Sequence, residues 1–104
     1  MELLTVVEEM LLLTVFKLGD NAYGVPIRET VMEMTGKRIV YGTLYNSLNQ
    51  LVRKGYVRTE RGEPTAARGG RSKVFYRLTD YGTEALQFTR DRRSAIWADV
   101  PDLA

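Results

Sequence analysis

The chain has 104 residues, of which 44% are hydrophobic and 27% charged, so it has the composition of one globular domain and not of a disordered segment. It contains neither cysteine nor histidine, which excludes disulfides, thiolate metal sites and any catalysis that requires those residues. No stretch is long and apolar enough for a membrane span and no signal peptide is recognisable, so we expect a cytoplasmic protein without a cofactor.

The net charge of +2 hides an uneven distribution of charge. Residues 1–36 hold two cations and six acids, a balance of −4, and residues 78–104 hold three cations and five acids, a balance of −2. Between them, residues 37–77 hold ten cations and two acids, a balance of +8. A basic segment of this kind is the electrostatic footprint of a polyanion-binding surface, although a solvated charged face is the commoner explanation.

Two helices are predicted in the first third of the chain. Residues 3–18 are apolar on more than one side, which indicates a helix that is central in the fold or that serves two interfaces. Residues 24–35 form the second helix, with Pro26 in its first turn and Gly36 just after its last. Residues 37–40 form a short link, for which an extended strand is one interpretation.

The third predicted helix, residues 42–54, has two chemically distinct faces. Leu44, Leu48 and Leu51 form one apolar stripe at helical spacing. A helix that presents amides and a cation on its other face suits the DNA major groove, because Asn and Gln can pair with adenine and Arg with guanine or phosphate. A merely solvated surface is the alternative, and for a lone helix the commoner one. The face opposite the stripe holds Gly42, Asn46, Asn49, Gln50 and Arg53, flanked by Thr43 and Tyr45.

Two segments of alternating hydrophobicity, residues 56–61 and 71–78, surround a Gly- and Pro-rich loop at 63–70 and predict a β-hairpin. A last helix follows from the N-cap Thr79 to about Ala98 and ends before Pro101. The order helix, helix, helix, hairpin, helix predicts a mainly α protein with a small β-hairpin wing, a winged helix-turn-helix. Cations beside the predicted loop suit a phosphate backbone, which raises the case for DNA binding.

Other functions are less well supported by the residues. The loop "GEPTAARGGR" lacks a following GK[ST] and joins two strands, so it does not fit a nucleotide phosphate loop. No paired acids, metal-ligand spacing or nucleophile elbow is apparent, so we do not expect an enzyme or a metal site. A winged-helix protein-interaction module and a ligand-sensing dimer without specific DNA binding stay open as alternatives.

Two segments, "GTLYNSLNQLVRKGYV" and "GGRSKVFYRLTDYGTEAL", together resemble the PadR-like transcriptional regulators. The "AYG" at residues 22–24 resembles the family's aromatic-Gly opening of the second helix. The resemblance covers about residues 3–88. The family usually carries Ser-Pro or a similar pair before GTLY, whereas this chain has Val40-Tyr41, so Tyr41 is either a DNA contact or a packing residue.

The resemblance implies a homodimeric winged-helix regulator, often a repressor, that binds a palindromic operator through the recognition helix at 42–54 and a basic wing at 61–73. In this interpretation residues 1–78 are the DNA-binding domain. The expected partners are double-stranded DNA and a second copy of the chain. The predicted DNA-binding residues are Tyr23, Tyr41, Gly42, Thr43, Tyr45, Asn46, Asn49, Arg53, Arg68, Arg71 and Lys73.

The final helix resembles the family's dimerisation helix, so residues 79–104 are predicted to be a dimerisation helix with a short tail. In some family members, aromatic side chains at the dimer interface bind flat hydrophobic effectors. Trp97 is the candidate for that role here, and a purely structural interface tryptophan is the favoured alternative. The predicted dimer interface consists of Leu3, Leu4, Val7, Leu11, Phe88, Ile96 and Trp97.

Overall fold

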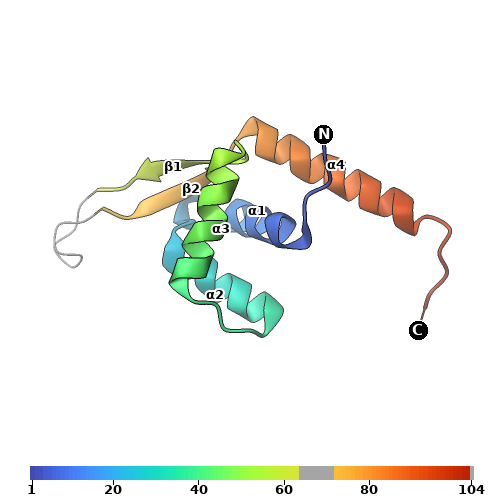
Figure 1. Cartoon of the computed structure of the whole chain (residues 1–104), viewed down its shortest axis with the longest axis horizontal. Helices are drawn as coiled ribbons and strands as arrows, with labels where there is room; N and C mark the ends of the chain where they lie inside the picture. The colour runs from blue at the N-terminus through green and yellow to red at the C-terminus, as the bar shows by residue number, and fades with distance from the viewer. Residues whose placement is uncertain (64–71, 104) are drawn as a thin grey trace.

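The computed structural model describes residues 1–63 and 72–103. It confirms the predicted order of three helices, a hairpin and a last helix, with one short 3-10 turn, η1, after the first helix. In Figure 1 the hairpin projects from one side of the helical body and α4 extends from the other. The elements are α1 (Val6–Leu18), η1 (Gly19–Asn21), α2 (Gly24–Thr35), α3 (Tyr41–Arg53), β1 (Val57–Arg61), β2 (Val74–Leu78) and α4 (Asp80–Trp97).

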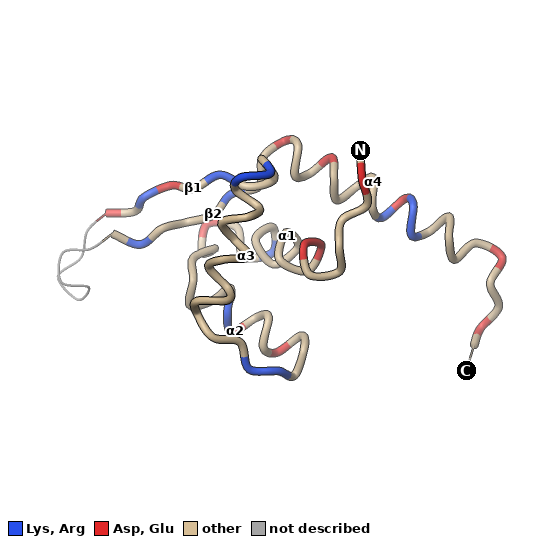
Figure 2. The backbone as a smooth tube through the Cα atoms, viewed as in Figure 1, with Lys and Arg blue, Asp and Glu red and all other residues tan. Residues whose placement is uncertain are grey.

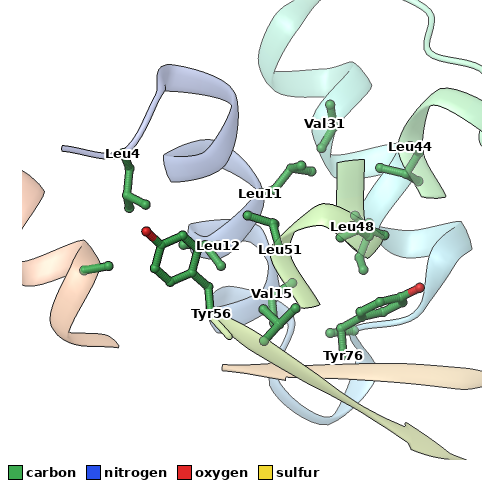
Figure 3. Close-up of a cluster of buried hydrophobic side chains, with 14 residues drawn as sticks. Leu4, Leu11, Leu12, Val15, Val31, Leu44, Leu48, Leu51, Tyr56 and Tyr76 are labelled. Atoms are coloured by element: carbon green, nitrogen blue, oxygen red, sulfur yellow. The ribbon is translucent and has the colours of Figure 1, made fainter. Parts of the chain in front are cut away.

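The hydrophobic core surrounds α1, which packs against α2, α3, α4 and β2. Leu12 of α1 and Leu48 of α3 are fully buried, and Figure 3 shows Leu11, Leu12, Val15 and Leu51 gathered between these helices and the start of the hairpin. Of the two interpretations of this apolar helix, the central position in the fold is therefore confirmed, while a role in a second interface stays a prediction. None of the helices in the described ranges is long and apolar enough to span a bilayer.

The predicted start of the first helix at residue 3 is wrong by three residues. Thr5 is the N-cap: its Oγ1 accepts a hydrogen bond from the Glu8 N–H at 3.1 Å, and Glu8 Oε1 accepts one from the Thr5 N–H at 2.9 Å. This reciprocal capping box fixes the first helical residue at Val6. Leu4 lies in the preceding extended segment, where its N–H donates to Thr89 Oγ1 of α4 at 3.1 Å. Apolar spacing continues through residues that are not helical, which explains the error.

Gly36 ends α2 in the left-handed conformation, with φ 69°, and its N–H donates to Met32 O at 2.8 Å. Residues 37–40 are not part of a strand, so the interpretation of this link as a strand is wrong, although the backbone of Val40 is extended. The recognition helix α3 starts at Tyr41, one residue earlier than predicted, and ends at Arg53, with Lys54 as its C-cap.

The hairpin pairs β1 and β2 antiparallel, with Val57 opposite Leu78 and Arg61 opposite Val74. Both strands are shorter than predicted, because β1 starts one residue later and β2 starts at Val74 instead of residue 71. Most of the predicted loop at 63–70 lies outside the described residues. The base of the wing is joined to the start of α2 by a hydrogen bond from the Tyr76 N–H to Ala22 O at 2.8 Å.

Helix α4 begins as predicted at the N-cap Thr79, whose Oγ1 accepts from the Gly82 N–H at 3.0 Å. Its buried residues are Gly82, Ala85 and Thr89, which face the protomer's own body. Gly82 lies so close to the segment after α3 that a Cβ there would be 2.1 Å from the Tyr56 carbonyl oxygen. This close approach fixes the angle at which α4 leaves the body.

Candidate nucleic-acid interface

The two predicted faces of α3 are present in the structure. Leu44, Leu48 and Leu51 are buried against α1 and α2, whereas the opposite side of the helix is open to solvent. Together with Tyr23, just before α2, and Lys73, just before β2, the exposed residues of α3 form what we call the polar surface. Its α3 members are Tyr41, Gly42, Thr43, Tyr45, Asn46, Asn49, Gln50 and Arg53, all exposed.

The first turn of α3 has no side-chain cap. Its N-cap Val40 is extended, with ψ 150°, and offers no hydrogen-bonding side chain, and the first helical bond runs from the Leu44 N–H to Val40 O at 3.1 Å. Among the described residues no partner is seen for the N–H groups of Tyr41, Gly42 and Thr43. A helix N-terminus that presents such groups to solvent is suited to an anion such as a backbone phosphate.

Aromatic stacking holds the start of α3. The rings of Tyr41 and Tyr45 stack at 5.9 Å with an interplanar angle of 21°. The guanidinium of Arg28 from α2 lies over the Tyr41 ring, with Cζ 4.8 Å from the centroid, and Arg28 Nε donates to Ile39 O at 2.6 Å. Tyr41 therefore packs and is exposed at once, so the two interpretations of this residue are compatible. Sequence reasoning missed Arg28, because nothing in its local pattern reveals a ring 13 positions away.

Tyr23 connects α2 to the wing. Its ring meets Phe75 edge to face at 5.6 Å, and the Lys73 ammonium lies 4.2 Å from the centre of the same ring. This cation–π contact holds Lys73 beside the recognition helix. Tyr23, Tyr45, Asn49 and Lys73 are among the residues that line a groove of about 250 Å³ between α3 and the wing.

Gly24 is a second residue whose role sequence reasoning missed. The Tyr45 side chain lies against it, and a Cβ at this position would be 2.1 Å from the Tyr45 hydroxyl oxygen. Only glycine lets that ring occupy its present position between α2 and α3. The signal in the sequence is the pairing of the "AYG" and "GTLY" motifs, which the fold brings together.

Several cations of the basic segment are neutralised by ion pairs. Arg77 Nη1 contacts Asp20 Oδ1 at 2.8 Å and also donates to Gly19 O at 2.9 Å, while its Nε pairs with Glu60 Oε2 at 3.2 Å. Arg58 is the second partner of Glu60. Hydrogen bonds from Arg58 and then Arg77 lower the pKa of Glu60, so it stays ionised in mildly acidic solution. The network ties both strands of the wing to η1.

A further ion pair joins the C-terminal end of α3 to the start of α1, where Lys54 Nζ lies 2.6 Å from Glu8 Oε2. Partial burial pushes the pKa of Glu8 up, but hydrogen bonds from Lys54 and from the Thr5 backbone outweigh it and lower the pKa. The same hydrogen bond raises the pKa of Lys54. Lys54 is therefore paired with an acid of the same chain, whereas no ion-pair partner is seen for Arg53 or Arg61 within the described ranges.

The predicted DNA-binding residues fall into three groups. The seven on α3 lie together on the polar surface, and Tyr23 and Lys73 lie half-buried at its edge. Arg68 and Arg71 lie outside the described residues. Exposure and proximity agree with the prediction, while contact with DNA stays a prediction.

The predicted dimer residues are divided between surface and core. Leu3, Val7, Ile96 and Trp97 are exposed and Phe88 is half-buried. Leu4 and Leu11, by contrast, are 3% and 2% exposed within the protomer, so they have almost no surface left for a partner. Their apolar character serves the core between α1, α3 and α4, as Figure 3 shows for both side chains.

Exposed apolar side chains occur on α1, on α4 and on residues 1–5, which we call the N-terminal arm. Together we call these side chains the apolar surface. Phe16, 69% exposed, and Leu13 line a groove of about 500 Å³ between α1 and α4 together with Leu78 and Leu86. A separate groove of about 450 Å³, which shares no lining residue with the first, lies between the residues before α1 and the end of α4. The exposed members of this surface are Leu3, Val6, Val7, Leu13, Phe16, Ile96 and Trp97.

No group of three or more acidic side chains that could hold a metal ion is found in residues 1–63 and 72–103. The chemistry of the polar surface is that of hydrogen bonding and charge, with amide, hydroxyl and guanidinium groups pointing away from the core.

Comparison with known proteins agrees with the winged-helix fold and identifies a family. The family model described as "Transcriptional regulator PadR-like family" matches residues 12–88, which is more than half of the chain. No curated protein matches the chain. The matched region contains α2, α3, the wing and the first half of α4.

Three solved structures are similar to this chain. RosR of H. salinarum is 27% identical, with 95% of this chain and 82% of that chain covered and a TM-score of 0.68. A PadR-like transcriptional regulator from Bacillus cereus is 17% identical, with 91% and 87% covered and a TM-score of 0.69. A PadR family transcription regulator from Clostridium difficile is 24% identical, with 84% and 88% covered and a TM-score of 0.62. The last two support the fold alone.

Proposed function

Because the chain belongs to the PadR-like family of transcriptional regulators, we propose that it is a repressor that binds a palindromic operator as a homodimer. The observation that carries the proposal is the polar surface. There α3 exposes Asn46, Asn49 and Arg53 to solvent, while the leucines on the opposite face of the same helix are buried in the core. The family is one of transcriptional regulators and not of enzymes. The expected place of action is the cytoplasm.

The proposed reading of DNA bases uses the middle of α3. Asn46 and Asn49 lie three residues apart and are therefore neighbours on one face of the helix. Each side-chain amide can donate a hydrogen bond to N7 of an adenine and accept one from its N6 amino group. Tyr23, Tyr45 and Lys73 line the groove beside Asn49, and in this proposal they contact sugar and phosphate groups.

The proposed dimer uses the apolar surface. Phe16 and Trp97 are 69% and 60% exposed, which is unusual for large hydrophobic side chains in a soluble domain unless another surface covers them. A second copy of the chain offers the same residues, so a twofold contact between α1 and α4 of the two protomers would bury both sets. Two recognition helices related by a twofold axis match a palindromic operator.

The first test is a fluorescence-anisotropy titration of the protein with the DNA just upstream of its own gene and with a scrambled duplex, at near-physiological salt. We expect the two affinities to differ by about 10³ or more. Equal, salt-sensitive affinities would contradict sequence-specific regulation from this promoter. An absence of binding to both would favour the winged-helix protein-interaction module.

A base-reading role for Asn49 is tested by Asn49→Ala. We expect the ratio of operator affinity to scrambled-DNA affinity to fall by about 5- to 150-fold, which corresponds to about 1–3 kcal/mol of binding free energy. The affinity for scrambled DNA should change little. Asn21→Ala is the matched control, because it removes an exposed asparagine side chain from η1, outside the polar surface. Equal loss on both duplexes for Asn49→Ala would contradict base reading.

A ligand-sensing role is the second candidate, and the groove between α1 and α4 favours it. Its volume of about 500 Å³ and its lining by Leu13, Phe16 and Leu86 suit a flat hydrophobic molecule, with Trp97 exposed on the same surface. Quenching of Trp97 fluorescence by such a molecule, together with a change in operator affinity, is the expected result. Quenching without a change in affinity would indicate binding without regulation.

A further inference from the structure

A shallow basic pocket lies at the end of α2, away from the wing. It has a volume of about 470 Å³ and is lined by Arg28, Met32, Gly36, Lys37 and Arg38. Three of its five lining residues are cations, and neither glutamate of α2 is among them. In Figure 2, the cations of the turn after α2 and those of the wing lie in separate regions of the molecule.

Among the described residues, no acid pairs with the cations of this pocket. In the part of the chain that the structure describes, no ion pair is seen for Arg28, Lys37 or Arg38. This distinguishes them from Lys54, Arg58 and Arg77, which are paired. Positive charge that is concentrated in a depression and left uncompensated favours an anionic ligand.

Arg28 is held in place before any ligand arrives. Its Nε donates to Ile39 O at 2.6 Å and its guanidinium stacks on the Tyr41 ring, which leaves the two terminal NH₂ groups for another acceptor. A guanidinium fixed in this way loses little rotational freedom on binding, and its fork geometry matches two oxygens of a phosphate group. The same contacts join the pocket to the first residue of the recognition helix.

We propose that this pocket binds a phosphodiester of the DNA backbone, with Arg28 as the fixed ligand and Lys37 and Arg38 as mobile ones. The inference rests on the proposed DNA binding and adds a third contact area to α3 and the wing. The pocket is wide open to solvent, whereas a small free anion or nucleotide would need a more enclosed site. Its position beside the uncapped start of α3 gives a backbone strand a continuous path from these cations to the free N–H groups of that helix.

The test compares Lys37→Glu with Lys17→Glu, which makes the same charge change at an exposed residue at the end of α1. On operator and on scrambled DNA alike, Lys37→Glu is expected to raise Kd by about 10-fold or more, and Lys17→Glu by about twofold at most. The slope of log Kd against log salt should fall by about 0.9 for each phosphate that the variant no longer binds, and thus by about 2 in a dimer. Equal effects of the two variants would overturn the proposal.

Neutral methylphosphonate linkages, placed one at a time along the operator, locate the bound phosphate. We expect one position in each half-site at which the neutral linkage weakens binding by the wild-type protein but not by Lys37→Glu. If every position weakens both proteins equally, the pocket does not bind the backbone. A Lys37-dependent complex with inorganic phosphate, measured at matched ionic strength and without competition by DNA, would assign the pocket to a free anion and overturn the proposal.

The outcomes of this test separate the pocket from the proposed function. If the wild-type protein does not distinguish operator from scrambled DNA, sequence-specific regulation fails. The comparison of Lys37→Glu with Lys17→Glu on scrambled DNA still decides whether the pocket contacts phosphate, because backbone contacts do not depend on sequence.

Discussion

The polar surface and the apolar surface differ in what holds their exposed side chains. On the polar surface, the Tyr41 ring contacts both Tyr45 and the Arg28 guanidinium, and the Lys73 ammonium lies over Tyr23, so these groups are positioned by contacts within one chain. On the apolar surface, Phe16 and Trp97 project into solvent, and within the described residues no aromatic ring or cation stacks on either of them. The side chains of the first surface are therefore held in place by contacts within the chain, whereas in the proposed dimer those of the second would gain order from the partner.

The helices that carry the two surfaces, α3 and α4, are joined by a short junction of hydrogen bonds and one ring stack. Thr79, the N-cap of α4, donates its hydroxyl to Gly55 O at 2.5 Å and its N–H to Tyr56 O at 3.1 Å, directly after α3. Tyr56 and Tyr81 stack at 5.2 Å with their planes 16° apart. The direction of α4 is therefore fixed relative to α3, so the proposed dimer, if built on α4, would have a defined distance between its two recognition helices.

Phe16→Glu should break the apolar surface and give the largest effect. In the proposed dimer a carboxylate at position 16 would be buried without an opposite charge to pair with, which is costly, so we expect the variant to be a monomer. Operator affinity should fall by about 10²–10⁴, because the two half-sites are no longer bound by one linked molecule. Sedimentation and anisotropy titration measure the two effects. Met34→Glu on exposed α2 should leave the dimer intact; a dimeric Phe16→Glu protein would place the interface elsewhere.

Gly82→Ala should damage the junction between the surfaces. The new methyl group would overlap the Tyr56 carbonyl, so α4 and the segment after α3 must move apart, and we expect the free energy of unfolding to fall by about 2 kcal/mol. Denaturant unfolding measures it. Gly42→Ala is the control, because no atom lies within 4 Å of a Cβ at that helical position and the change should stabilise slightly. Equal stability of the two variants would show that the junction yields easily.

Arg77→Gln should loosen the wing without touching α3. Arg77 joins Glu60 of β1 to Asp20 and Gly19 of η1, and its loss releases the hairpin from the body. We expect Kd to rise by at most about fivefold on both duplexes, in keeping with a single partly exposed ion-pair cluster. Amide exchange in β1 and β2 should become faster. Arg58→Gln is the control, because it also removes one positive charge from the wing but leaves the contact of Arg77 with η1 intact. Equal amide exchange rates in the two variants would show that Arg77 does not anchor the wing to η1.

Lys54→Gln should give the smallest effect, one that depends on pH. The folded pKa of Glu8 is lowered, so its contribution to stability is present above the ordinary pKa of 4.5 and is lost as pH falls through the lowered value. The folded pKa of Lys54 is raised above its ordinary value of 10.5, so its contribution to stability is present below pH 10.5 and is lost as pH rises through the raised value. Thermal unfolding should show the variant less stable at neutral pH and equal to wild type in acid, with Lys17→Gln as a control that shows no such convergence.

Local patterns determined which elements form and which residues of α3 are exposed. The spacing of Leu44, Leu48 and Leu51 requires the intervening amides to face away from them, because the helical period is a property of the backbone. The alternation in β2 and the N-cap at Thr79 are likewise fixed within a few residues. These features, and the mainly α winged helix that they compose, were therefore within reach of the sequence.

Contacts between distant segments were decided only by the tertiary structure. Leu4 is buried because its backbone meets Thr89, 85 positions away, and no periodicity in either segment indicates that meeting. The stacking of Arg28 on Tyr41, the cation–π contact of Lys73 with Tyr23 and the need for glycine at Gly24 arise in the same way. A repeating pattern specifies the face of an element, while the partner of that face depends on how all the elements pack together.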